Sequence, residues 1–69
     1  MLTIEIEQDH DGRWIGEVTA LPGVLAYGAT ADEARSKAAA LALRVIADRI
    51  EHGEAVPDLS NVFVETTSS

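Results

Sequence analysis

The sequence predicts a two-layer α+β domain in which one long helix packs on one face of an antiparallel sheet, in the element order β-β-β-α-β. Three observations indicate this class. Residues 2–19 contain two alternating segments of apolar and polar side chains that are separated by a short turn. Residues 31–52 carry a helical pattern with start and stop signals, and residues 61–66 alternate again. Strands that precede and follow a single helix favour a helix segregated to one face of the sheet.

The first two strands are predicted to form a β-hairpin. In residues 2–7 three apolar side chains alternate with three polar ones, namely Leu2, Ile4 and Ile6 with Thr3, Glu5 and Glu7. This period of two is typical of a strand with one buried and one solvated face. The turn formers of residues 8–12 follow, and residues 13–19 place Trp14, Gly16 and Val18 on one face and Ile15 and Glu17 on the other.

A second turn and a short third strand are predicted next. In Leu21-Pro22-Gly23-Val24 the proline presets φ at the second position, and the glycine accepts the positive φ that a type II turn requires at the third. Residues 24–28 then complete an antiparallel meander.

The helix is predicted to run from Ala31 to about His52. Thr30 and Glu33 fit a capping box, and Gly53 supplies a stop signal. Two apolar stripes follow from a rotation of about 100° per residue. The stripe expected on the sheet consists of Ala34, Ala38, Leu41 and Val45, and the second consists of Ala39, Leu43, Ile46 and Ile50. The second stripe either extends the same core or forms a subunit contact, for which Leu43, Ile46 and Ile50 are the candidates.

Residues 61–66 predict a last strand, with Val62 and Val64 on one face and Phe63 and Glu65 on the other. The domain is therefore expected to span residues 1–66, and residues 67–69 are expected to be a disordered tail. The outer face of the sheet then combines apolar and acidic side chains and is a candidate binding surface. Its members are Ile15, Phe63, Glu5, Glu7 and Glu17.

Composition narrows the choice of partner. Among 69 residues, 12 acids against 5 bases give a net charge of −7, which disfavours direct contact with nucleic acid and favours a basic protein partner. Eleven of the apolar residues are alanines, so large core side chains are scarce and a homo-oligomer, a dimer or tetramer, is expected. No apolar run reaches the roughly 20 residues that span a bilayer, and no signal pattern opens the chain, so no membrane contact and a cytoplasmic location are expected.

No catalytic constellation is evident, so we expect a protein that is not an enzyme and that needs no cofactor and no metal. The chain has no cysteine, and neither His10 nor His52 has the serine partner of a nucleophilic mechanism. The turn Asp9-His10-Asp11-Gly12 resembles the start of a calcium loop, but the ligands that should follow are missing. A metal-dependent nuclease built on Asp9 and Asp11 is a minor alternative.

Several motifs, taken in order, resemble the N-terminal domain of HicB-type antitoxins. They are the acidic Asp9–Gly12 turn, Trp14-Ile15-Gly16-Glu17-Val18, Leu21-Pro22-Gly23-Val24, the Gly28-x-Thr30-x-x-Glu33-Ala34 entry to the helix, and Glu54-Ala55-Val56-Pro57 after it. The resemblance covers residues 2–66. It implies a partial ribonuclease H-like fold and a HicA-type toxin partner, a small basic protein that cleaves mRNA with a histidine that the antitoxin covers. Many members also carry a C-terminal DNA-binding module, for which we expect no room after Thr66.

The leading hypothesis is an antitoxin-type binding protein that masks a small basic HicA-like toxin by steric and electrostatic occlusion. The expected toxin contacts are Glu5, Glu7, Ile15, Glu17 and Phe63. The alternative is a stand-alone homo-oligomeric scaffold of the same fold without a toxin.

Overall fold

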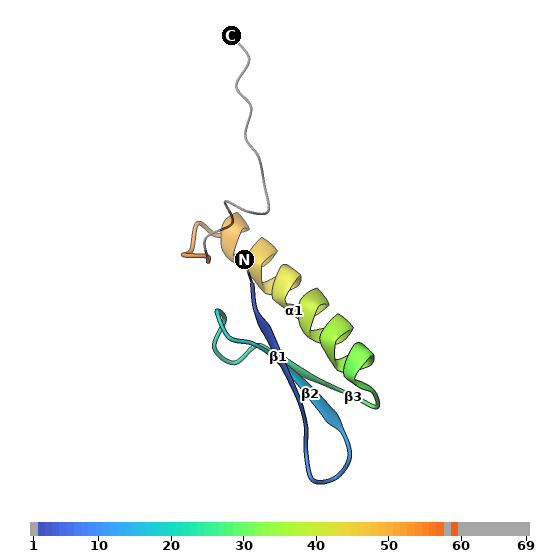
Figure 1. The fold of residues 1–69 in the computed structure, drawn as a ribbon. Helices are drawn as coiled ribbons and strands as arrows, with labels where there is room; N and C mark the ends of the chain where they lie inside the picture. Colours follow the sequence, from blue (N-terminus) through green and yellow to red (C-terminus); the bar gives the residue numbers. More distant parts are fainter. Residues whose placement is uncertain (1, 58, 60–69) are drawn as a thin grey trace.

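The structure is a computed structural model that describes residues 2–57 and 59. It contains three strands, β1 (Ile4–Gln8), β2 (Trp14–Val18) and β3 (Leu25–Gly28), and one helix, α1 (Ala31–Glu51). The strands form an antiparallel sheet in the order β1-β2-β3, and α1 packs on one face, mainly over β2 and β3 (Figure 1). The predicted α+β class is thereby confirmed. The predicted last strand at residues 61–66 and the tail at 67–69 lie outside the described residues.

The β1–β2 hairpin is closed by the carboxylate of Asp9. Its Oδ1 atom accepts hydrogen bonds from the backbone N–H groups of Asp11 (2.9 Å) and Arg13 (3.1 Å). The N–H of Asp9 donates to the Arg13 carbonyl at 2.8 Å, and Gly12 takes the positive φ of 87° that the turn requires. Asp9 therefore holds the turn together, because its side chain supplies acceptors that the reversing backbone lacks.

The turn before β3 has the predicted geometry. The N–H of Val24 donates to the Leu21 carbonyl at 3.0 Å, and Gly23 has φ 87°. The carbonyl of Val24 then accepts the N–H of Val18, so the turn is anchored to the end of β2. The consequence is that Leu21 is folded back beneath the sheet and is fully buried.

The helix begins and ends at the predicted signals. The Thr30 hydroxyl accepts the N–H of Glu33 at 3.1 Å, which satisfies one of the free donors of the first turn. The Glu33 carboxylate accepts the N–H of Ala29 at 3.0 Å, one residue earlier than a capping box requires. At the other end His52 caps α1, and Gly53 takes φ 68°.

Glu33 is expected to link the stability of the fold to pH. Its hydrogen bond from the Ala29 N–H, assisted by Lys37 at 3.4 Å, lowers the pKa of this carboxyl below 4.5, its ordinary value. A lowered folded-state pKa stabilises the fold above the unfolded-state pKa, and this stabilisation is lost as pH falls through the folded-state value. We expect Glu33→Gln, which keeps the acceptor, to be less stable than the wild type at pH 7.

Urea unfolding at pH 7 and at pH 3 measures this difference. The difference in unfolding free energy between the wild type and Glu33→Gln should be smaller at pH 3 than at pH 7. The control is Glu54→Gln, whose difference from the wild type in unfolding free energy should change less between the two pH values. If the difference between the wild type and Glu33→Gln is the same at both pH values, the lowered pKa of Glu33 in the folded protein is contradicted.

The core lies between α1 and the sheet. Its buried members are Val18, Leu21, Val24, Ala38, Ala42 and Ile46. The predicted sheet-facing stripe is correct for Ala34 and Ala38, which are buried, whereas Leu41 and Val45 are half-buried beside Ala42 and Ile46. The buried residues of α1 follow one another every four positions, from Ala34 to Ile46. Four residues turn a helix by about 400°, so the side of α1 that meets the sheet shifts by about 40° at each of these steps. Such a shift is expected where a straight helix packs on a twisted sheet, because the direction of the sheet surface changes along the helix.

Candidate functional site

The face of the sheet opposite α1 carries two cross-strand rows of side chains. Strand register sets Glu5 opposite Glu17 and Glu17 opposite Leu25 in one row, and Glu7 opposite Ile15 and Ile15 opposite Tyr27 in the next. The alternation of β1, β2 and β3 points all six side chains away from the helix. We call this surface the outer face.

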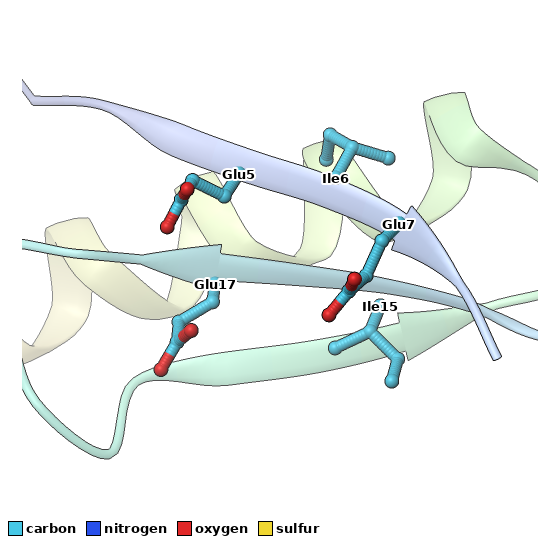
Figure 2. Close-up of a pocket in the computed structure, with 5 residues that line it drawn as sticks. All are labelled: Glu5, Ile6, Glu7, Ile15 and Glu17. Carbon is cyan, nitrogen blue, oxygen red and sulfur yellow. The ribbon is translucent and has the colours of Figure 1, made fainter.

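Glu5, Glu7 and Glu17 project from the outer face with α1 behind the sheet (Figure 2). All three are exposed, while Ile15 beside them is half-buried. Together with Ile6 they line a shallow hollow of ≈ 150 Å³. Three glutamates and two isoleucines thus line this hollow.

The three carboxylates are not neutralised by this part of the chain. None of the ion pairs found among residues 2–57 and 59 includes Glu5, Glu7 or Glu17. Like charges directly opposite one another, as at Glu5 and Glu17, destabilise a sheet. The facing carboxylates of Glu5 and Glu17 therefore carry an electrostatic cost within the sheet.

Arg13 is the base nearest to this face, and it is already engaged at the hairpin end. Its guanidinium lies 4.7 Å from the centre of the Tyr27 ring and 3.6 Å from the Asp9 carboxylate. A cation over an aromatic face is attracted by the ring quadrupole. The other four bases lie on α1, which covers the opposite side of the sheet: Arg35, Lys37, Arg44 and Arg49. Because α1 also carries four acids, the charges on the helix side balance, whereas the outer face carries three carboxylates.

The structure brings together four of the five predicted contact residues, Glu5, Glu7, Ile15 and Glu17. Phe63, the fifth, lies outside the described residues. Two apolar members were missed, the exposed side chains of Leu25 and Tyr27. Alternation within β3 was the available signal, because residues 25 and 27 must share a face and β3 follows β2 in an antiparallel meander.

The predicted self-association residues separate into two groups. Leu43 and Ile50 are exposed, at 62% and 52% of their surface. Ile46 is only 4% exposed and belongs to the core, so at this position the second stripe extends the core, which was the first of the two alternatives. It is buried because the side of α1 that meets the sheet turns by about 40° every four residues, from Ala34 through Ala42 to Ile46.

The remaining candidates have local structural roles or solvated positions. His10 is exposed in the hairpin turn. The Nδ1 atom of His52 lies 2.7 Å from the Asp48 carbonyl and 3.4 Å from its carboxylate, at the end of the helix where a cation is favoured. Within the described ranges no three His, Cys, Asp or Glu residues are placed to hold a metal ion.

Membrane crossing has no candidate in the described part of the chain, because its one helix is not apolar enough over the necessary length. What these residues define is a small α+β domain with an open acidic sheet face on one side and a helix on the other. Comparison with protein-family models, with curated proteins and with solved structures finds no match to this chain.

Proposed function

We propose that this protein is a HicB-like, antitoxin-type binding protein that masks a small basic mRNA-cleaving toxin of HicA type through its outer face. The observation that carries the proposal is the set of three exposed carboxylates around Ile15, with no cation paired to them in the described chain. Glu5, Glu7, Ile15 and Glu17 are the proposed contacts. Phe63 is proposed to extend the same surface.

Electrostatics supports a protein partner of this kind. An enzyme that binds RNA must present basic groups to the phosphate backbone. A carboxylate-bearing surface attracts the same groups, speeds the encounter and competes with RNA for them. The exposed Leu25 and Tyr27 add apolar area next to the acidic row, which suits an interface better than a fully charged surface does.

Inhibition by occlusion requires no chemistry from this chain. The proposal therefore includes neither catalysis nor a cofactor, and no direct contact with nucleic acid. Since the proposed target cleaves mRNA, we propose that the protein acts in the cytoplasm.

Charge reversal on the outer face tests the proposal. The tagged protein is purified from its native cells, the co-purifying proteins are weighed by mass spectrometry, and a small basic partner is expressed and assayed for RNA cleavage. Glu5→Lys combined with Glu17→Lys is expected to weaken binding of that partner at least about tenfold, because attraction becomes repulsion at two positions. Inhibition of RNA cleavage should weaken in parallel.

The matched control is Glu54→Lys combined with Glu51→Lys, which makes the same charge change at the far end of α1. This variant should retain most of the affinity. Equal affinity of the outer-face variant and the wild type refutes the assignment of the surface. Failure to recover any basic RNA-cleaving partner refutes the antitoxin function itself.

A homo-oligomeric scaffold without a toxin is the second candidate, and the exposure of Leu43 and Ile50 favours it. It predicts that the protein recovered from its native cells contains copies of this chain alone.

A further inference from the structure

One exposed strip of α1 carries no charged side chain over about four turns, between residues 36 and 50. Five exposed residues follow one another at spacings of four, three, four and three positions: Ser36, Ala40, Leu43, Ala47 and Ile50. At 100° per residue they fall within a sector of about 80°. A surface helix normally presents charged and polar side chains to water on this side, whereas the alternating spacing of four and three is that of a helix–helix seam.

This seam is continuous with an apolar groove between α1 and β1. The groove has a volume of ≈ 150 Å³ and is lined by Leu2, Ile4, Val18, Ala39, Ala42 and Leu43. Leu43 belongs to both features. The helix packs less extensively on β1 than on β2 and β3, which leaves this flank open. The apolar surface therefore extends from the solvent side of the helix to the edge of the core.

Most charged residues of α1 beside the seam lie on its other flank, and Asp32 and Arg35, which pair with each other, lie at its N-terminal end. Those on the other flank are Glu33, Lys37, Arg44, Asp48 and Glu51. From these features we infer that α1 packs antiparallel against α1 of a second copy of this chain, across a two-fold axis level with residue 45. Identical surfaces related by a two-fold axis form a closed dimer. The inference does not depend on the proposed function.

Side-chain size supports this register. With the axis at residue 45, Leu43 of one copy lies level with Ala47 of the other, and Ala40 lies level with Ile50. Each large side chain thus meets a small one, which lets the helices approach to the 8–10 Å of close helix packing. The two helix dipoles also oppose each other in this arrangement.

Charge supports the same register. In an antiparallel pair the charged flanks of the two helices run side by side in opposite order. Lys37 of one copy then lies within one helical turn of Glu51 in the other. Arg44 lies level with residue 46 of the other copy, so it is within one turn of both Asp48 and Arg44 there, and the two-fold axis gives two Arg44–Asp48 pairs for one pair of Arg44 side chains. A second copy therefore complements both the apolar seam and its charged border, while the outer face of each sheet stays free for a different partner.

Solution mass tests the dimer. Sedimentation equilibrium of the full chain at micromolar concentration is expected to give twice the 7.3 kDa mass of one chain. Leu43→Glu should reduce the mass to that of a monomer while the helical circular dichroism is kept, because Leu43 is 62% exposed and a glutamate fits there. The matched control is Leu25→Glu on the outer face, which should remain a dimer.

Cross-linking tests the register, because the chain has no cysteine. Under mild oxidation, a mixture of Ala40→Cys and Ile50→Cys proteins is expected to form a mixed disulfide. Ala40→Cys alone should not cross-link, since its two copies would lie about 15 Å apart along the helix axis. A monomeric wild type, as when residues 60–69 of the same chain cover the seam, overturns the inference. So does a disulfide formed by Ala40→Cys alone, which would indicate parallel helices.

Discussion

Gly28→Ala is expected to destabilise the domain by about 3 kcal/mol or more, at the upper end of the cost of overpacking. A Cβ atom at Gly28 would lie 2.5 Å from the backbone nitrogen of Ala34 and 2.9 Å from the Cβ of Glu33. Backbone atoms of a capped helix cannot move aside as a flexible side chain can. The N-terminal turn of α1 would have to lift away from β3, which would also expose the buried Ala34.

Urea unfolding of the wild type and Gly28→Ala measures this loss, which is a large share of the total of about 3–10 kcal/mol expected for a chain of this size. The matched control is Gly12→Ala, which meets nothing within 4 Å and is strained only by its φ of 87°. Its cost should be about 1–2 kcal/mol. If the two alanine variants unfold at the same urea concentration, close packing of α1 on β3 is not what Gly28 provides.

Leu21→Ala is expected to cost about 2–5 kcal/mol, the range for removing a buried leucine. Leu21 has no exposed surface and is one of the two largest fully buried side chains in the described chain, the other being Val18. The helix contributes mainly alanines to this core, so few neighbouring side chains are long enough to fill the space that Leu21 leaves.

The control for this prediction is Leu25→Ala, which changes the same residue type at a position on the outer face that is 37% exposed. We expect it to cost less than half as much, because little apolar surface is removed from a packed environment. Thermal unfolding followed by circular dichroism compares the two. If the two variants lost the same stability, burial of Leu21 in the core would not account for its contribution.

The local elements of the fold were predictable because each rests on residues close together in the chain. The hairpin turn depends on Asp9 and Gly12, and the turn before β3 depends on Pro22 and Gly23. The start of the helix depends on the Thr30 hydroxyl. In each case the donor and acceptor are separated by only a few residues. The one local error concerned Glu33, whose carboxylate accepts from Ala29 and not from the cap residue itself.

The candidate site was predictable for the same reason within each strand. Alternation alone assigns Glu5 and Glu7 to one face of β1, and Ile15 and Glu17 to one face of β2. That Leu25 and Tyr27 complete the surface follows from the pairing of β3 with β2, which joins residues about ten positions apart.

The order of the first four elements, the faces of the strands and the limits of the helix were all predictable, because they follow from periodicity and from short-range hydrogen bonds. The side of α1 that meets the sheet at each turn was not predictable, because it depends on the packing of distant elements. Periodicity sets the angle between two side chains on a helix, but the direction of the core depends on how the helix crosses a twisted sheet. That crossing buries Ile46 and leaves Leu43 and Ile50 in solvent, although all three lie on the same predicted stripe.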